Sequence, residues 1–285
     1  MMISVVIPLY NKERSIQDTI NSVLNQSYAN FELIIVNDGS TDDSLEVVVS
    51  MHDPRIIVVN KENGGVSSAR NLGIHKSSYE YIAFLDGDDI WSPNHLEILY
   101  GSLSLLDSDC IGGAGTTFYK SHHKIFDQTR FKKSEPKVID DYFEFMSSST
   151  GRFNSSTLLV KKSKILETGL FNESLKYGED VEFWIKLFSN YKLIYNNCVT
   201  AVYYLAAENR SVHYVMPLEK RFHLFDYSNK SISEKKYLDK LVALIVLDYF
   251  QQGAYSHMFK ILNLYRYRIL GVMGYFIRLI IKKLK

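Results

Sequence analysis

The amino-acid sequence predicts an α/β fold, in which helices flank a mainly parallel sheet and a helical extension follows at the C-terminus. Short β-branched runs alternate with helical stretches over the first hundred residues, a pattern typical of βαβ units. The runs are almost continuously apolar, as expected for strands that are covered on both faces. The 285 residues are 46% hydrophobic and 23% charged, a globular composition that excludes disordered and fibrous proteins.

The first half of the chain predicts four strand-helix pairs. The strands are expected at residues 3–8, 31–36, 55–59 and 81–85. Apolar residues at i, i+4, i+7 and i+8 from Ile16 predict an amphipathic helix after the first strand. Cap residues at 40–43, a glycine turn at 64–65 and Ser-Pro at 92–93 predict the starts of the next three helices.

The second half is less regular. From about residue 109 the pattern loosens into Gly-rich, basic-aromatic and Ser-rich segments, and we expect them to form substrate-facing surface. A helix is predicted over residues 179–189 and a strand over residues 201–205. Residues 232–285 are again helical in pattern, with apolar runs and a basic end.

Cysteine usage and the N-terminus predict a cytoplasmic protein. Cys110 and Cys198 are too few for a disulfide framework and lack the C-x-x-C spacing of a zinc or redox motif. The N-terminus has no basic region ahead of its apolar run and meets Pro8 almost at once, so no cleaved secretory signal is expected.

The C-terminal segment carries a concentrated positive charge. Residues 249–285 contain seven Lys or Arg and no acid, so that with a total of +1 the rest of the chain carries −6. Its longest uncharged apolar run, Ile269–Ile277, is far shorter than the ~20 residues needed to span a bilayer. We favour peripheral association of residues 260–285 with an anionic membrane, at the inner face of the cell membrane. The alternative is a packed helix with a solvated basic face. Because the body is acidic, nucleic acid is not an expected partner.

Polar residues follow three of the predicted strands, at the edge of the sheet where ligands of parallel sheets bind. Asp86, Asp88 and Asp89 place three carboxylates within four residues, and their mutual repulsion needs a cation or hydrogen-bond donors nearby. Carboxylate oxygens together with a substrate phosphate suit Mg²⁺ or Mn²⁺. A turn followed by helix-capping acids explains the same residues equally well.

Other motifs narrow the class of protein. Asp38 follows the second strand, where an Asx-turn or a helix cap is the alternative to ligand binding. The glycine pair at 64–65 is too short for a dinucleotide fingerprint, and the chain contains no G-x-x-x-x-G-K-[ST]. Dehydrogenase and P-loop kinase functions therefore lose support.

Four ordered motifs resemble the family 2 glycosyltransferases. They are VIPLYN at 6–11, VNDGSTD at 36–42, NGGVSSARNLG at 63–73 and FLDGDD at 84–89. The resemblance covers about residues 3–106 and resumes in GEDVEFW at 178–184. It implies a GT-A fold, a nucleotide-diphospho-sugar donor, most simply a UDP-sugar, a divalent cation (Mn²⁺ or Mg²⁺), and transfer with inversion at the anomeric carbon.

The resemblance also implies roles for individual residues. The donor-binding group comprises Pro8, Tyr10, Asp38, Arg70, Asp86 and Gly87. Asp38 would accept a hydrogen bond from the base, and Asp86 would lie near the ribose and the metal. Asp88 would be the principal metal ligand, with Asp89 supporting it indirectly.

The later motif supplies the expected base. Glu179 and Asp180 resemble the E-D pair of the family, in which the aspartate takes the proton of the acceptor hydroxyl. An acid that stabilises a helix N-terminus is the alternative for this pair. Further along, Arg210 or His213 is placed where related transferases close over the diphosphate. The chain lacks the Q-x-x-R-W motif of processive synthases, so one sugar per encounter is expected.

These observations predict a single-sugar transferase that acts on a hydroxyl of a glycan or lipid-linked glycan in bacterial cell-surface polysaccharide synthesis. The expected catalytic domain is 1–230, with a nucleotide-binding half (1–108) and an acceptor-binding half (109–230), followed by the extension 231–285. A nucleotidyltransferase is one alternative, although residues 9–13 lack the glycine of its first loop. A catalytically silent sugar-nucleotide-binding protein is the other, and the retained acids argue against it.

Overall fold

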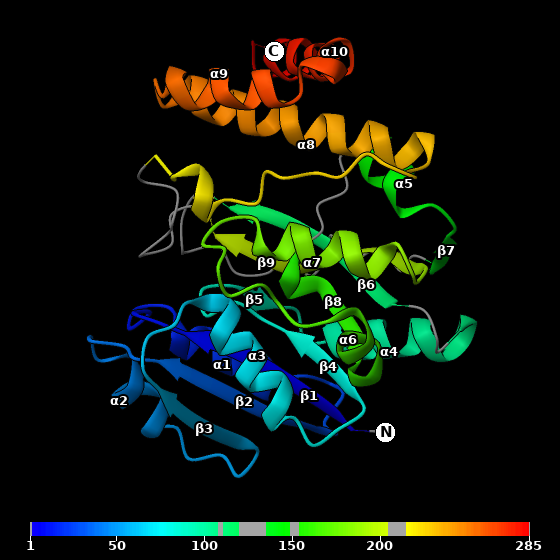
Figure 1. Ribbon diagram of the computed structural model, residues 1–285. Helices are drawn as coiled ribbons and strands as arrows, with labels where there is room; N and C mark the ends of the chain where they lie inside the picture. The colour runs from blue at the N-terminus through cyan, green and yellow to red at the C-terminus, as the bar shows by residue number, and fades with distance from the viewer. Residues whose placement is uncertain (1, 108–110, 120–134, 149–153, 205–214, 285) are drawn as a thin grey trace. The chain divides into compact units, whose positions relative to one another are not determined.

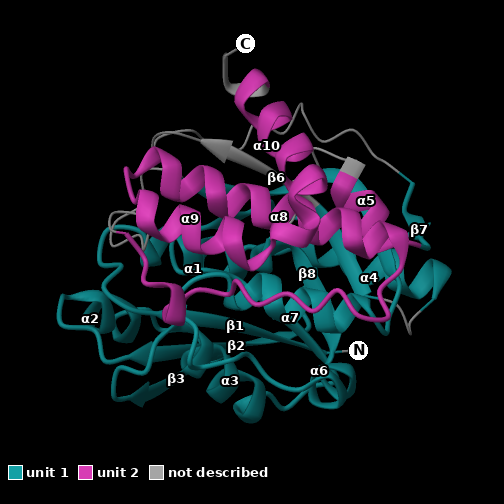
Figure 2. Cartoon of the chain, turned by 45° about the horizontal axis from the view of Figure 1, so that its top comes forward, with its two compact units in different colours: residues 1–140, 152–210 teal, residues 141–151, 211–285 magenta. Residues whose placement is uncertain are grey.

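The computed structural model (Figure 1) describes residues 2–107, 111–119, 135–148, 154–204 and 215–284. The chain divides into two compact units, which Figure 2 colours separately. Unit 1 comprises residues 1–140 and 152–210, and unit 2 comprises residues 141–151 and 211–285. The expected boundary at residue 230, and the division of residues 1–230 into two halves, stay predictions.

Unit 1 is built on one sheet. Within the described residues its strands are β1 (Ile3–Leu9), β2 (Phe31–Asp38), β3 (Ile56–Lys61), β4 (Tyr81–Phe84), β5 (Ile90–Trp91), β6 (Ile111–Tyr119), β7 (Lys137–Ile139), β8 (Leu158–Lys161) and β9 (Leu193–Tyr204). Its helices are α1 (Ile16–Leu24), α2 (Ser44–Val49), α3 (Val66–Lys76), α4 (His95–Leu106), α6 (Lys162–Thr168) and α7 (Glu179–Phe188), with a short 3-10 helix at Ser155–Thr157.

The strand order is β3-β2-β1-β4-β8-β6-β9-β5, and β7 pairs with β9. The first four strands are mutually parallel, whereas β8 runs antiparallel to both of its neighbours. The four strands predicted for the first half are all present, with ends within two residues of the expected ones. The strand expected at 201–205 is the last part of the longer β9.

The two faces of the sheet pack against different helices. Val5, Ile7, Leu33 and Ile35 belong to one fully buried cluster that includes residues of α1, α2 and α4. Ile34 instead packs with side chains of α3 on the opposite face. Because side chains alternate along a strand, this division follows from the period of two in the apolar runs. It explains why the runs are apolar at nearly every position.

A glycine allows α3 to lie close to the sheet. A Cβ atom added at Gly73 would lie 2.3 Å from Cγ1 of Val6, a separation that packed atoms do not adopt. Val6 is fully buried on β1. The packing at position 73 therefore requires glycine. The close approach of α3 to β1 also fixes the position of the other buried residues of α3 relative to the carboxyl ends of the strands.

Unit 2 is mainly helical over its described residues. It contains α5 (Tyr142–Ser148), α8 (Ile232–Gln251), α9 (Tyr255–Leu264) and α10 (Ile269–Leu284), with 3-10 helices at Leu218–Lys220 and Arg266–Arg268. Arg268 binds buried Asp239 of α8 through Nε (3.0 Å) and Nη2 (2.6 Å). A Cβ at Gly271 would lie 2.2 Å from Oδ2 of Asp239, and Val272 is fully buried. One face of α10 is thus packed on α8.

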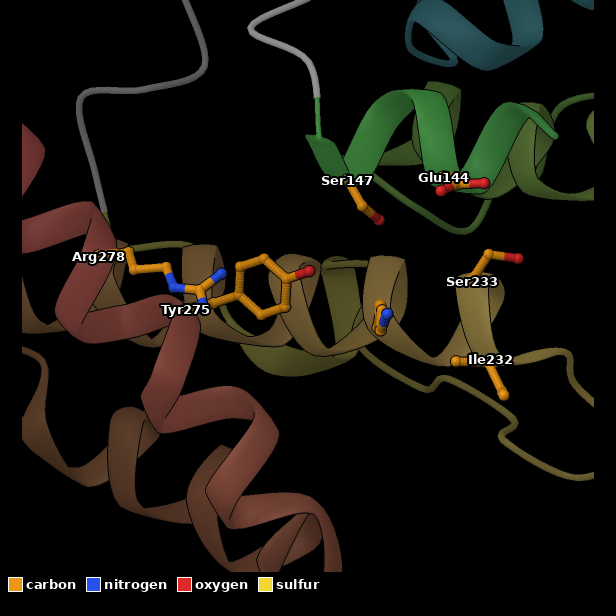
Figure 3. Close-up of a pocket in the computed structure, with 7 residues that line it drawn as sticks. Glu144, Ser147, Ile232, Ser233, Tyr275 and Arg278 are labelled. Atoms are coloured by element: carbon orange, nitrogen blue, oxygen red, sulfur yellow. The ribbon is translucent and has the colours of Figure 1, made fainter.

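A cavity of about 500 Å³ lies within unit 2, between side chains of α5, α8 and α10 (Figure 3). It is lined by Glu144, Ser147, Ile232, Ser233, Lys236, Tyr275 and Arg278. The predicted donor, metal and base residues are all absent from this lining. Those residues all belong to unit 1.

The close packing of α3 gives a test of the fold. Gly73→Ala should lower the free energy of unfolding by about 1–3 kcal/mol, because the added methyl group overpacks the contact with Val6. Gly101→Ala in α4 is the matched control, since a Cβ there meets nothing within 4 Å. It should raise stability by about 0.5–1 kcal/mol. Urea unfolding of the wild type and the two variants measures both changes in stability. Equal changes for the two substitutions would contradict the packing requirement for glycine at position 73.

Candidate active site at the carboxyl ends of the parallel strands

The predicted site residues lie at the switch point of the sheet. The chain runs outward from β1 to β2 and β3, then returns through α3 to β4 on the other side of β1. The loops after β1 and β4 therefore leave neighbouring strands in the direction of their carboxyl ends. In sheets of this kind a crevice for ligands forms at that point.

Hydrogen bonds join the loop after β1 to the loop after β2. Asn11, in the left-handed region with φ of 50°, donates its backbone N–H to Oγ of Ser40 at 3.2 Å and accepts from the backbone N–H of Thr41 at 2.8 Å. The backbone N–H of Lys12 donates to Oγ of Ser44 at 2.7 Å. These contacts fix the first loop over the start of α2.

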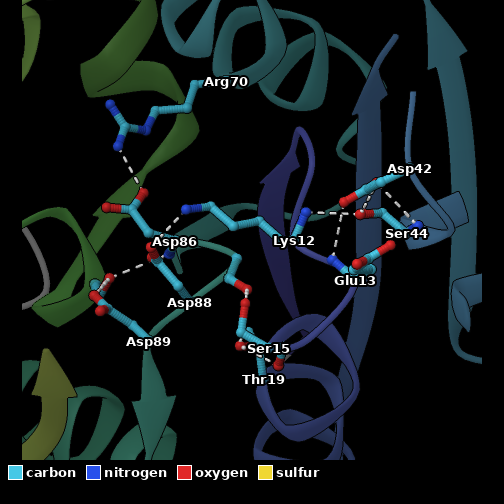
Figure 4. Close-up of polar contacts among 12 residues, drawn as sticks. Lys12, Glu13, Ser15, Thr19, Asp42, Ser44, Arg70, Asp86, Asp88 and Asp89 are labelled. Carbon is cyan, nitrogen blue, oxygen red and sulfur yellow. Dashed lines mark hydrogen bonds and ion pairs between the residues drawn. The ribbon is translucent and has the colours of Figure 1, made fainter. Parts of the chain in front are cut away.

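The acidic loop after β4 is held by α1 (Figure 4). The carbonyl oxygen of Gly87 accepts hydrogen bonds from the hydroxyls of Ser15 (3.1 Å) and Thr19 (3.2 Å). A Cβ at Gly87 would approach the carbonyl oxygen of Pro8 to 3.3 Å, so the loop passes close to the end of β1. Asp86 and Asp88 are thereby positioned by the backbone between them.

Buried Arg70 of α3 connects this acidic loop with α7. Its guanidinium donates to Oδ1 of Asp86 at 2.7 Å and to Oε1 of Glu179 at 3.2 Å, and it lies 5.3 Å from the centre of the Phe171 ring. Although burial opposes its charge, Asp86 and Glu179 raise the pKa of Arg70 above its usual value. Arg70 therefore stays charged and brings together two motifs that are about ninety residues apart in the sequence.

Asp180 lies in the first turn of α7, after Gly178 in the left-handed conformation. Removal from water and the neighbouring charge of Glu179 raise the pKa of Asp180 to about 7, and Arg70 limits this increase. A carboxylate with a pKa near neutrality is suited to accept a proton at physiological pH. The same residue also provides the negative charge that favours a helix N-terminus.

Asp86 and Asp88 are the candidate ligands for a divalent cation. Their side chains are 27% and 16% exposed, and each has one oxygen paired with a cationic side chain, Arg70 for Asp86 and Lys12 for Asp88. Within the described residues, no hydrogen bond or ion pair engages the second oxygen of either carboxylate. The described part of the chain contains no cluster of three or more His, Cys, Asp or Glu with metal-site geometry. Magnesium is commonly held by one or two carboxylates together with substrate phosphates, and these two residues fit that pattern.

Asp89 is buried, unlike Asp86 and Asp88. It is 1% exposed and accepts a hydrogen bond from Oγ of Ser156 at 2.5 Å, while the same oxygen of Ser156 accepts from the backbone N–H of Asp86 at 3.2 Å. Burial, followed by the charge of Asp88, raises the pKa of Asp89 well above its usual range. Asp89 thus holds the loop to Ser156, and its indirect support of a metal stays a prediction.

The residues predicted around the nucleoside differ in their exposure to solvent. Tyr10 is 42% exposed at the end of β1, so its ring is accessible for stacking. Asp38 is buried and accepts from Nζ of Lys61 (2.6 Å) and from the backbone N–H groups of Gly64 (2.9 Å) and Gly65 (2.7 Å). In this structure Asp38 fixes the turn before α3, and its contact with a base stays a prediction.

Two residues of the site were missed from the sequence. Lys12 directly follows the first motif, and its charge next to a predicted acidic site was the available signal. Ser156 belongs to a Ser-rich segment that carried no signal of its own. Arg210 and His213, predicted near the diphosphate, lie outside the described residues.

Comparison with solved structures supports this fold class. The chain resembles residues 1–349 of TarS from S. aureus, solved in complex with UDP-GlcNAc, with a TM-score of 0.59 and 19% sequence identity. The likeness covers 87% of this chain and 66% of that chain. The predicted fold, a mainly parallel α/β sheet of the GT-A type followed by helices, is confirmed.

The sequence comparisons identify the family. The model of Glycosyl transferase family 2 matches residues 4–166, more than half of the chain, which therefore belongs to this family. The resemblance in the ordered motifs is thus confirmed.

Individual relatives are matched over part of their length. An uncharacterized glycosyltransferase of Rickettsia typhi is 36% identical over 65% of this chain and 58% of its own length. The glycosyltransferase GlyG of Streptococcus pneumoniae is 34% identical over 60% and 58%. GgaA of Bacillus subtilis, a minor teichoic acid biosynthesis protein, is 33% identical over 65% of this chain and 43% of its own length. This chain therefore matches less than two thirds of each of these relatives.

Proposed function

We propose that this protein transfers a single sugar from a nucleotide-diphospho-sugar, with UDP as the nucleotide, to a hydroxyl of a glycan or lipid-linked glycan, with inversion. The observation that carries the proposal is the assembly of Arg70 with Asp86 and Glu179, which brings the acidic loop and the candidate base Asp180 to one place. Family membership and the UDP-GlcNAc complex of TarS support the same donor class.

Each step of the transfer would depend on particular residues of the chain. Tyr10 offers an exposed ring to the base, and Asp86 and Asp88 offer carboxylate oxygens at the diphosphate position. Mn²⁺ or Mg²⁺ held by these two residues would neutralise the charge that grows on the leaving diphosphate. Asp180 would take the proton of the acceptor hydroxyl while that oxygen attacks the anomeric carbon from the face opposite the diphosphate. The protein of B. subtilis named for teichoic acid biosynthesis supports cell-surface polysaccharide synthesis as the setting.

The donor proposal is tested by calorimetric titration with UDP, GDP, dTDP and CMP, each in Mn²⁺ and in EDTA. UDP should bind selectively, and more tightly with Mn²⁺. Asp88→Ala should abolish the gain from Mn²⁺, because the principal metal ligand is lost. Asp18→Ala, an exposed acid of α1, is the matched control and should behave as wild type. Failure of all four nucleotides to bind would contradict the proposed donor, and pyrophosphate release from a nucleoside triphosphate would favour a nucleotidyltransferase.

The proposed base gives a pH dependence. Below a pH of about 7 Asp180 is protonated and cannot accept a proton, so kcat/KM for sugar transfer should rise as the pH passes through about 7 and then level off.

Asp180→Asn should lower turnover by about a hundredfold to ten-thousandfold while UDP binding is retained. Glu46→Gln, at an exposed acid in the first turn of α2, controls for the loss of a helix N-terminal charge. Unchanged turnover in Asp180→Asn would move the base elsewhere.

We also propose that α9 and α10 associate with the anionic inner face of the cell membrane. These helices and the 3-10 helix between them expose apolar side chains at Tyr255, Phe259, Leu264, Tyr267, Leu270, Ile277 and Ile281. Exposed Lys260, Arg266 and Arg278 lie among them. Apolar and basic groups together suit an anionic lipid surface, where each basic residue near the surface contributes about 1 kcal/mol. No helix among the described residues is both long and apolar enough to cross a membrane.

Point substitutions test this association better than deletion, because deletion would remove Arg268 and Val272 from their packing on α8. Leu270→Asp combined with Ile277→Asp should weaken binding to phosphatidylglycerol-containing vesicles by about tenfold or more. Co-sedimentation measures it, and added salt should weaken wild-type binding as well. Leu105→Asp, at a position 73% exposed in α4 of unit 1, is the matched control. Equal binding by the control and the double variant would refute the proposed surface.

A further inference from the structure

Lys12 places a cation on the carboxylate that the proposed function assigns to the metal. Its Nζ lies 2.8 Å from Oδ2 of Asp88, and the two side chains are only 13% and 16% exposed (Figure 4). The pair joins the loop after β1 to the loop after β4, across the switch point of the sheet. The position of Lys12 therefore affects which ligands can bind to Asp88.

The backbone of Lys12 is firmly held. Its N–H donates to Oγ of Ser44 at 2.7 Å, and its carbonyl oxygen accepts from the N–H groups of Ser15 (3.1 Å) and Ile16 (2.9 Å). Its Cγ lies 3.5 Å from the point where a Cβ of Gly87 would be. The fold thus fixes the origin of the side chain at the acidic loop, while the four-carbon stem leaves its ammonium group free to change partners.

An ammonium group and a divalent cation compete for Asp88. Magnesium binds carboxylate oxygens at about 2.0–2.1 Å, which would bring it close to an ammonium group that already contacts the same carboxylate. Like charges at such a separation repel strongly where water is partly excluded. Withdrawal of Lys12 from Asp88 would relieve this repulsion as a metal binds, and it is easier when another anion can receive the ammonium group.

We propose that Lys12 makes metal binding depend on the donor: it holds Asp88 before the donor binds and moves to the donor diphosphate when metal and nucleotide enter together. The inference rests on the proposed function, in which the diphosphate lies at the metal. Lysine is a common partner of phosphate groups, as a point charge. Arg70 does not share this role, because it is buried and bound to two carboxylates at once.

The exchange predicts a measurable coupling between two ligands. In the wild-type protein UDP should raise the affinity for Mn²⁺ and, by linkage, Mn²⁺ should raise the affinity for UDP by the same factor. Lys12→Met removes the competing cation and keeps an unbranched stem of similar length. It should raise the Mn²⁺ affinity of the nucleotide-free protein by about tenfold and reduce the coupling to UDP correspondingly.

Electron paramagnetic resonance of Mn²⁺ measures the affinity without any turnover, with and without UDP. Lys12→Arg keeps the charge and should retain weak Mn²⁺ binding in the nucleotide-free protein. Lys176→Met controls for the general loss of a positive charge: its Nζ contacts the carbonyl oxygen of Gly64 at 3.0 Å, and its Mn²⁺ affinity should match wild type. Circular dichroism establishes that each variant is folded.

The outcomes separate the two proposals. If wild type binds Mn²⁺ with UDP but Lys12→Met leaves the nucleotide-free affinity unchanged, the role of Lys12 is overturned while the metal proposal stands. An equal gain in Lys12→Met and Lys176→Met also overturns it, since overall charge would then be the cause. If wild type binds UDP but never Mn²⁺, the metal proposal and the inference both fail, while the proposed donor is retained.

Discussion

The site depends on one buried cation. Arg70 binds Asp86 from the end of β4 and Glu179 from the start of α7, and its charge also acts on Asp180. Removing one partner from such a buried group leaves the other charges uncompensated, at a cost of about 3–5 kcal/mol. Without Arg70 the acidic loop and the helix that carries the candidate base would repel each other. The arginine thus makes an acidic site compatible with a folded unit 1.

The packing of α3 on the sheet determines the position of Arg70. It stands on α3, which crosses back over β1 and lies close to it because residue 73 is glycine. That crossing reverses the strand order and leaves the loops after β1 and β4 side by side. The hydroxyls of Ser15 and Thr19 then fix the acidic loop by donating hydrogen bonds to the carbonyl oxygen of Gly87. The chemistry of the site is therefore a consequence of the topology as much as of the acidic residues.

Much of the fold could be predicted, because apolar periodicity is a local property of the chain. The four parallel strands and the position of α7 follow from it, and the ordered motifs identified the family. Contacts between residues that are distant in the sequence could not be predicted from local periodicity. The pairing of Lys12 with Asp88, the turn of Asp89 toward Ser156 and the bond between Arg268 and Asp239 each join residues that no local pattern relates. The basic C-terminal helix packs one face on α8 and exposes apolar side chains elsewhere, and its association with a membrane stays a prediction.

The two cations of the site differ in the freedom that their chemistry gives them. Arg70 has a planar group that engages two carboxylates and lies almost entirely out of water, so moving it would expose several charges. Lys12 pairs with Asp88 through a flexible stem, and its backbone is anchored. A donor brings negative charge into a place whose acids are already paired, so it needs a cation that can be released. A fixed arginine that keeps the acids together and a lysine that can change partners meet both requirements.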